Sequence, residues 1–187
     1  MPAIKSLCLY CGSRNGTDPA HRAAAKRFGR AVAASGLRLV YGAGDYGLMG
    51  EAARAAQSAG AHVTGFIPRR LVDREVARTE CDALVVTETM HERKALMLGN
   101  ADAVVALSGG PGTLDELIEV LTWRNLGLHE KPVVLVNIAG YWDPLLALFR
   151  AMEAGGFSDA RFLAALTVVD SPEAAIAALT DTPARTD

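Results

Sequence analysis

The sequence predicts an α/β fold: a single doubly wound, Rossmann-like domain with a mainly parallel sheet of about seven strands flanked by helices. Two observations support this prediction. Short apolar runs of strand length alternate along the whole chain with longer segments that are rich in Ala, Leu and Arg and have helical spacing. Such alternation is typical of parallel strands joined by right-handed crossovers. The apolar runs are also continuous, as in strands that helices cover on both faces.

The N-terminal half contains three of the expected strands. Residues 4–10 form an apolar run, which a glycine-containing loop separates from an amphipathic segment at residues 19–35. Residues 37–41 repeat this pattern, with a second glycine loop and a helical segment at residues 48–59. Residues 62–67 form the next run. Each step is a strand followed by a helix, as in a doubly wound sheet.

The C-terminal half continues the alternation. An apolar run at residues 83–87 precedes a helical segment at residues 90–100. A run at residues 103–107 precedes a glycine-rich loop and an apolar helix around residues 117–128. The last two expected strands are residues 132–136 and 167–169.

Length and composition favour a soluble, single-domain protein. The chain has 187 residues, of which 50% are hydrophobic and 21% charged, enough to bury a core without disulfides or metals. Nothing resembles a linker before the polar segment 181–187. We therefore expect residues 1–180 to form one domain and residues 181–187 to form a polar C-terminal tail.

Charge and cysteine content exclude several classes of partner. The net charge of -2 gives no global basic field for nucleic acid. No apolar run reaches membrane-spanning length, and the N-terminus lacks the apolar core of a signal peptide. The odd number of cysteines argues against a disulfide framework and favours the cytoplasm. We expect a cytoplasmic protein that binds neither nucleic acid nor membranes.

The C-x-x-C motif of Cys8 and Cys11 does not predict a metal or redox site. Both residues fall on an expected strand rather than at a helix start, and no second pair follows to complete a zinc site. We therefore expect no metal.

Four loops at the carboxyl ends of expected strands have unusual sequences. They are residues 11–16, 42–47, 88–94 and 108–116. Because ligands of open parallel sheets bind at the carboxyl ends of the strands, these loops are expected to meet at one rim.

The loop at residues 108–116 is the strongest signal. Its glycines, Gly109, Gly110 and Gly112, allow a tight turn and close approach of a ligand. Thr113 is expected to open a helix, whose N-terminal N–H groups and positive dipole end bind phosphate. A Walker A loop would have Lys in place of Thr113, so NTP hydrolysis is not expected.

Thr113 and Glu116 allow two interpretations. Thr-x-x-Glu is the pattern of a capping box, in which Thr113 caps the helix and Glu116 bonds back to the cap N–H. Alternatively, the Glu116 side chain faces a ligand. The spacing alone favours capping, and it leaves both roles open.

The loop at residues 42–47, which includes Gly44, matches G-x-G-x-x-G after a strand, the pattern of dinucleotide-binding loops. However, the next strand leads into Pro68 and Arg69, without the acidic residue that binds the ribose of NAD. The loop is therefore expected either to contact phosphate or sugar through its backbone, or to be a tight turn only.

Arg93 and Lys94 fall in the first turns of the helix after the fourth strand. Cations there oppose the helix dipole, so they indicate either an anionic ligand or a solvated helix face. His91 and Glu92 are not part of an H-E-x-x-H metal site, because Ala95 replaces the second histidine.

Taken together, the motifs resemble the Lonely Guy (LOG) family of cytokinin riboside 5′-monophosphate phosphoribohydrolases, long labelled lysine decarboxylases. The family pattern P-G-G-x-G-T-x-x-E is met at residues 109–116, with Ser108 in place of proline. Residues 90–94 match a second motif. In the segment 41–50, Ala43 replaces the middle glycine of G-G-G. The resemblance spans roughly residues 7–157 and also covers residues 11–13, 121–123, 126–127 and 131–132.

This resemblance implies an enzyme that releases free base and ribose 5-phosphate from purine nucleoside 5′-monophosphates, among them N6-modified adenine nucleotides. It implies Arg93 and Glu116 as the catalytic pair, no cofactor, and a homodimer. The apolar helix at residues 117–128 either supplies the dimer interface or packs in the core. The implied substrate-binding residues are Ser13, Gly44, Glu75, Met90, Lys94, Gly109, Gly110, Pro111, Gly112, Thr113, Leu114, Asp115 and Thr122.

Two other functions remain open. A nucleotide or cofactor carrier could use the same phosphate loops without catalysis, since fold alone does not decide function. A decarboxylase would need a lysine that forms a Schiff base with pyridoxal phosphate, and among the four lysines only Lys94 falls near the expected site. In the hydrolase, an ionised Glu116 would stabilise the positive charge that builds on the ribose.

Overall fold

The apolar runs pair into one parallel sheet. The computed structural model describes residues 3–72 and 80–180, and within these residues the strand order is β4-β3-β2-β1-β5-β6-β7, with every neighbouring pair parallel. The predicted fold class is confirmed. The strands are β1 (Ser6–Tyr10), β2 (Arg38–Tyr41), β3 (Val63–Pro68), β4 (Ala83–Thr87), β5 (Ala103–Ala106), β6 (Val133–Val136) and β7 (Leu166–Val169).

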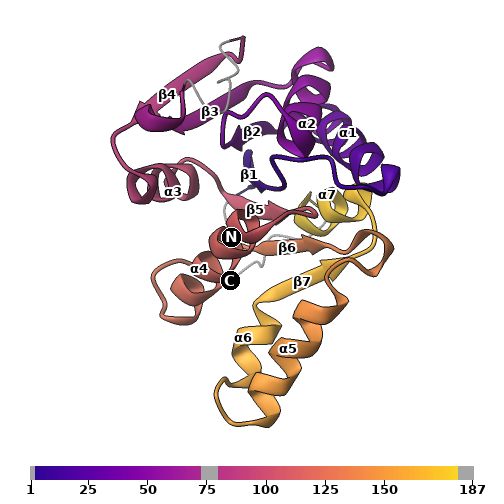
Figure 1. Cartoon of the computed structure of the whole chain (residues 1–187), viewed down its shortest axis with the longest axis vertical. Helices are drawn as coiled ribbons and strands as arrows, with labels where there is room; N and C mark the ends of the chain where they lie inside the picture. The colour runs from indigo at the N-terminus through magenta and orange to yellow at the C-terminus, as the bar shows by residue number, and fades with distance from the viewer. Residues whose placement is uncertain (1–2, 73–79, 181–187) are drawn as a thin grey trace.

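Helices cover both faces of the sheet (Figure 1). One apolar cluster joins α1, α2 and α7 to one face, and a second joins α3, α4, α5 and α6 to the other. No helix in the described ranges is long and apolar enough to cross a membrane. The helices are α1 (Pro19–Ala34), α2 (Gly47–Ser58), η1 (Arg69–Leu71), α3 (Met90–Gly99), α4 (Pro111–Asn125), η2 (Ile138–Gly140), α5 (Asp143–Ala154), α6 (Ala160–Ala164) and α7 (Pro172–Thr180).

Strand β1 shows why the strands read as continuous apolar runs. Leu7 and Leu9 are buried in the cluster that contains α1, whereas Cys8 and Tyr10 are buried in the cluster on the opposite face. Successive side chains of a strand point to opposite faces, so a strand covered on both faces needs an apolar residue at every position. Full burial of each leucine contributes about 1.5–3 kcal/mol.

The switch point of the sheet lies between β1 and β5. From β1 the chain proceeds outward to β2, β3 and β4, and then crosses to β5 on the other side of β1. Helix α1 covers one face and α4 the other, so the loops after β1 and β5 lead away in opposite directions and leave a crevice at their carboxyl ends.

The apolar helix predicted near residues 117–128 corresponds to the middle and end of α4. Leu117, Val120 and Leu121 are buried in the core, so for these residues core packing is the correct interpretation. Leu126 and Leu128, at and beyond the end of the helix, are 66% and 69% exposed.

Candidate active site

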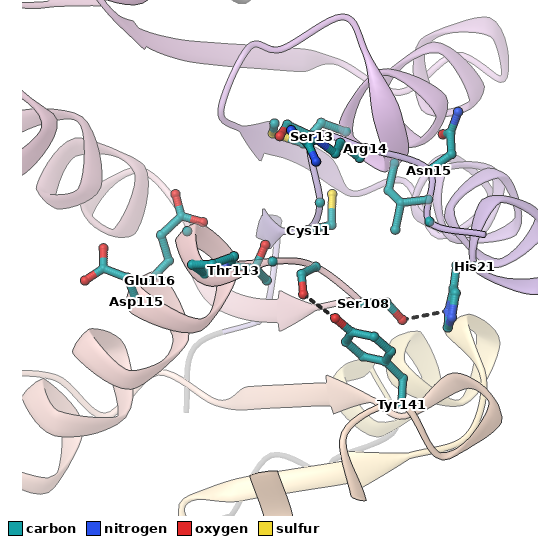
Figure 2. A pocket seen from close by; sticks show the side chains of 18 of the residues that line it. Cys11, Ser13, Arg14, Asn15, His21, Ser108, Thr113, Asp115, Glu116 and Tyr141 are labelled. Atoms are coloured by element: carbon teal, nitrogen blue, oxygen red, sulfur yellow. Dashed lines mark hydrogen bonds between the residues drawn. The ribbon is translucent and has the colours of Figure 1, made fainter. Parts of the chain in front are cut away.

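A cavity of about 600 Å³ lies at the carboxyl ends of β1 and β5 (Figure 2). Its walls come from the loops after these two strands and from the first turns of α1, α2, α3 and α4. Three of the four loops that the sequence places at this rim line the cavity, namely residues 11–16, 88–94 and 108–116, whereas no residue of the loop 42–47 does. The sequence-predicted site residues that line the cavity are Ser13, Met90, Arg93, Lys94, Gly109, Gly110, Pro111, Gly112, Thr113, Asp115 and Glu116.

Helix α4 begins earlier than the sequence pattern predicts. Its first residue is Pro111 and its cap is Gly110, with no hydrogen bond from a capping side chain. The capping-box interpretation of Thr113 and Glu116 is therefore wrong, because Thr113 already lies inside the helix. Proline is favoured at the first helical position, where its missing N–H costs nothing.

This helix start leaves backbone donors available to an anion. The first hydrogen bond of the helix runs from the Leu114 N–H to the Gly110 carbonyl (3.1 Å). The N–H groups of Gly112 and Thr113 precede it, and the helix itself offers them no acceptor. Together with the positive end of the helix dipole, these donors give this end of the cavity the chemistry that favours a negatively charged group.

Glycines bring the loops after β1 and β5 into contact. The Gly12 N–H donates to the Ser108 carbonyl (3.0 Å). A Cβ atom at Gly109 would lie 2.1 Å from Thr113 Oγ1 and 2.9 Å from the Gly12 nitrogen. Only glycine fits here, because Gly109 packs between the neighbouring loop and the buried Thr113 side chain.

Arg93 is buried with its guanidinium at the cavity wall. Its Nε donates to the Phe66 carbonyl (3.1 Å) and its Nη2 to the Gly42 carbonyl (3.4 Å). Its Nη1 lies 3.4 Å from Glu116 Oε1 and 3.2 Å from the sulfur of Met90. The interpretation of this position as a solvated helix face is wrong.

Glu116 approaches Arg93 from the second turn of α4. Its side chain is 11% exposed and lines the cavity. The carboxylate therefore lies one helical turn beyond the backbone N–H groups of Gly112 and Thr113. An arginine and a carboxylate, both nearly buried, thus lie beside the N-terminus of α4.

Lys94 ties α3 to α4. Its Nζ lies 3.0 Å from both Asp115 Oδ2 and Glu119 Oε2, and its side chain is buried. Burial lowers the pKa of Lys94, but the hydrogen bonds to Asp115 and Glu119 outweigh burial and raise it above its usual value. A Schiff-base lysine needs a neutral amine with a lowered pKa, so this environment argues against the decarboxylase alternative.

Three of the other candidate residues lie away from the cavity walls. Leu114 is part of α4 but its side chain is 37% exposed, and Thr122 is exposed six residues beyond Glu116, about 9 Å along the helix. Gly44 is buried in the loop after β2. None of the three is among the lining residues. Glu75 lies outside the described residues.

Sequence reasoning missed two aromatic residues of the cavity, His21 and Tyr141. His21 lies in the first turn of α1, and Tyr141 follows η2 at the carboxyl end of β6. The switch-point rule could have drawn attention to Tyr141 by its place after a strand. Nothing local in the sequence distinguishes His21.

The C-x-x-C motif is structural. Cys8 and Cys11 are buried in clusters on opposite faces of the sheet. Burial raises the pKa of Cys8 to about 12 and also raises the pKa of Cys11, which disfavours the thiolate form that reacts or binds metals. Within residues 3–72 and 80–180, no three His, Cys, Asp or Glu side chains group to hold a metal.

Comparisons with known proteins agree with the motifs. The family model described as "Possible lysine decarboxylase" matches residues 49–179. A "Probable cytokinin riboside 5′-monophosphate phosphoribohydrolase" of Oryza sativa subsp. japonica, LOG4, is 40% identical over 181 residues, covering 97% of this chain and 79% of the rice protein. The phosphoribohydrolase LOG7 of Arabidopsis thaliana is 41% identical over 172 residues, covering 91% and 78%.

Solved structures share the fold at lower identity. The molybdenum cofactor carrier protein of Chlamydomonas reinhardtii superposes with a TM-score of 0.71 at 23% identity, covering 95% of this chain and 97% of that chain. The molybdenum cofactor binding protein of Rippkaea orientalis gives a TM-score of 0.73 at 22% identity, with coverages of 97% and 98%. At this identity the likeness shows the fold alone.

Proposed function

This chain belongs to the LOG family, and we propose that it hydrolyses the N-glycosidic bond of purine nucleoside 5′-monophosphates. The products are the free base and ribose 5-phosphate. The names of the relatives indicate N6-modified adenines of the cytokinin class as bases, with plain adenine as the other candidate. Relative rates on the two monophosphates decide between them.

The observation that carries the proposal is the Arg93–Glu116 pair beside the N-terminus of α4. The two side chains lie 3.4 Å apart and almost buried in the cavity wall. A 5′-phosphate held by the N–H groups of Gly112 and Thr113 leaves its ribose extending toward Glu116, which is one turn further along the same helix.

The reaction builds positive charge on the sugar. The bond between C1′ and the base nitrogen breaks, and its electron pair leaves with the base, which takes up a proton. A water oxygen bonds to C1′ and gives up a proton. Glu116 would stabilise the cationic sugar, bind its hydroxyls or orient the water, and removal of such a preorganised group costs about 100- to 1000-fold in rate.

Arg93 is suited to hold Glu116 in place. Its bonds to the carbonyls of Phe66 and Gly42 fix the guanidinium from behind, so its Nη1 faces Glu116 without freedom to swing away. The side chain of Lys94 is held by Asp115 and Glu119, which makes it a brace between α3 and α4 at the edge of the same cavity.

The test is the variant Glu116→Gln, with base release from AMP and from isopentenyladenosine 5′-monophosphate followed by chromatography. The variant keeps the shape of the side chain and removes its charge, so we expect folded protein with a rate about 100- to 1000-fold lower. Turnover near the wild-type rate would remove Glu116 from the mechanism.

The matched control is Glu173→Gln on α7. Glu173 also pairs with an arginine, Arg27, at 3.3 Å, but both side chains are about half exposed. Exposed ion pairs contribute little, so this control should keep full activity. Adenosine, which lacks the phosphate, should not be cleaved by either protein.

The second candidate function is that of a nucleotide or cofactor carrier, because the same fold and loops can bind such a ligand without catalysis. A carrier would bind AMP stoichiometrically and return it intact. Folded wild-type protein that binds AMP and releases no base would favour this alternative.

The family membership also supports a homodimer in the cytoplasm. Leu126 and Leu128 at and beyond the end of α4 are exposed apolar side chains, which a second copy of the chain would cover in a dimer. Sedimentation of wild-type protein and of Leu126→Ser/Leu128→Ser tests this, since loss of the dimer is expected only if these side chains contribute to the interface.

A further inference from the structure

The end of the cavity opposite Glu116 is lined by two rings that the proposed mechanism does not use. His21 and Tyr141 both line the cavity, and their ring centroids lie 5.3 Å apart in an edge-to-face arrangement. They come from different parts of the fold, the start of α1 and the turn after η2. Figure 2 places both on the far side of Thr113 from Glu116.

Each ring makes a hydrogen bond to the loop after β5, which leads into the proposed phosphate site. Ser108 Oγ and His21 Nδ1 lie 2.8 Å apart, and the Tyr141 hydroxyl donates to the Gly109 carbonyl (2.6 Å), as the dashed lines in Figure 2 show. Ser108 is buried, so its bond to His21 is shielded from competing water. The two rings therefore fix the backbone that leads into Gly110 and the start of α4.

The order of groups along the cavity follows from α4. The backbone donors of Gly112 and Thr113 stand at its N-terminus, and Glu116 lies one turn further on. Consider a nucleotide whose C1′ lies beside Glu116 and whose 5′-phosphate lies at the start of α4. The phosphate oxygens that point away from the ribose then face the end of the cavity opposite Glu116. That end is where His21 and Tyr141 stand.

We propose that His21 and Tyr141 are specificity-determining and positioning residues: they hold the phosphate loop and close the cavity behind the 5′-phosphate, so that a nucleoside monophosphate fits and a diphosphate does not. The assignment of the ligand as a nucleotide rests on the proposed function. The assignment of the two rings as a wall of the cavity depends on their two hydrogen bonds to the loop after β5 and on the contact between the rings.

The two roles of Tyr141 can be separated by substitution. Tyr141→Phe keeps the ring and removes the bond to the Gly109 carbonyl, so AMP affinity should fall about two- to tenfold while the ratio of AMP to ADP affinity stays unchanged. Tyr141→Ala also removes the ring. It should admit the second phosphate and bring ADP affinity close to AMP affinity.

His21 offers the same separation. His21→Asn retains a polar group for Ser108 and should bind AMP better than His21→Ala does. The larger truncation removes both the bond and the edge of the wall that touches Tyr141. His21→Ala should therefore bring the ADP affinity closer to the AMP affinity, as Tyr141→Ala does.

The experiment is calorimetric titration with AMP and with ADP, with all variants made in the Glu116→Gln background so that bound AMP is not consumed. The parent should bind AMP about tenfold or more tightly than ADP, a difference of about 1.4 kcal/mol or more. The control is Phe157→Ala, since Phe157 is 87% exposed and is not a cavity residue; it should keep the parent's ratio. Melting curves verify that each variant is folded.

A parent that binds ADP as tightly as AMP would overturn the proposal, and so would folded Tyr141→Ala and His21→Ala variants that keep the parent's ratio. The assay does not depend on turnover. If the wild-type protein releases no base but these variants lose the selectivity for AMP over ADP, the proposed hydrolase function is rejected. The assignment of His21 and Tyr141 then still holds.

Discussion

The placement of Arg93 can be tested without touching any charged residue, by the variant Gly42→Ala. A Cβ atom at position 42 would lie 1.9 Å from Arg93 Nη2. To reach an ordinary contact distance of 3.4 Å, the guanidinium must move by about 1.5 Å. It is held from behind by the Phe66 carbonyl, so the movement also separates it from Glu116.

Two magnitudes follow from this displacement. A shift of about 1 Å in a catalytic group costs on the order of 100-fold in rate, so kcat/KM for AMP should fall about 100-fold. Overpacking in a buried site costs about 1–3 kcal/mol, and about 2–4 °C in Tm is expected for each kcal/mol in a chain of this length. The protein should therefore stay folded at assay temperature while losing most of its activity.

Steady-state kinetics and a melting curve measure both effects, with Gly99→Ala as the matched control. Gly99 ends α3, the helix that carries Arg93, and a Cβ there would meet no atom within 4 Å. The control should keep its activity and gain roughly 0.5–1 kcal/mol.

A double-mutant cycle completes the test. In an Arg93→Ala background, Gly42→Ala should cost no further activity, because the group that it displaces is gone. Full activity in folded Gly42→Ala, or an equal further loss in the Arg93→Ala background, would refute the reasoning.

Three further predictions concern stability and cofactor chemistry. Gly65→Ala would place a Cβ 2.7 Å from the Ala43 Cβ and should destabilise the protein by about 1–3 kcal/mol. Urea unfolding should show that Gly65→Ala lowers the free energy of unfolding less in an Ala43→Gly background. An equal loss in both backgrounds would contradict this contact. Burial raises the pKa of Asp102, but hydrogen bonds from the backbone and side chain of Ser6 and from the Lys5 N–H lower it below 3.8 overall. This carboxylate therefore stabilises the fold above pH 3.8 and loses that contribution as pH falls through its lowered pKa, so Asp102→Asn should flatten acid unfolding curves; identical curves would contradict it. Because hydrogen bonds raise the pKa of Lys94, pyridoxal phosphate followed by borohydride should leave Lys94 unlabelled in mass spectra.

The fold and the location of the site were predictable because they depend on local patterns. Continuous apolar runs at strands such as residues 133–136 identify a sheet covered on both faces. The glycine loops then mark the carboxyl ends of the strands. Both signals are contained within a few residues of sequence, and neither requires knowledge of contacts between distant segments.

The errors in the site arose where tertiary contacts decide. Arg93 reads as a surface residue because α3 is only weakly amphipathic. Its side chain is held by the carbonyl of Phe66 in β3 and by that of Gly42 in the loop after β2, and both are distant in sequence. Thr-x-x-Glu predicts that α4 starts at Thr113, whereas the helix begins at Pro111, a residue type that is favoured at the first helical position. His21 is 87 positions from Ser108, a contact that no local pattern contains.

The two departures from the family's motifs are each matched by a second residue elsewhere in the fold. Proline before the first glycine would fix the backbone of the loop by its ring. Ser108 lacks that ring, but its side chain bonds to His21 and its carbonyl accepts from Gly12, so hydrogen bonds replace covalent stiffness. Ser108 and His21 therefore act as a pair.

Ala43 shows the same logic in steric terms. Its φ of 59° lies in the left-handed region, which costs an alanine about 1–2 kcal/mol relative to the right-handed conformation. Its side chain is accommodated because the neighbouring strand presents Gly65, where any Cβ would collide with that of Ala43. The strain is thus confined to the backbone of one residue, and the loop that positions the Gly42 carbonyl for Arg93 keeps its shape. A substitution in a glycine loop of this fold is therefore best interpreted together with the residue that faces it, because the space available to one residue depends on the size of the other.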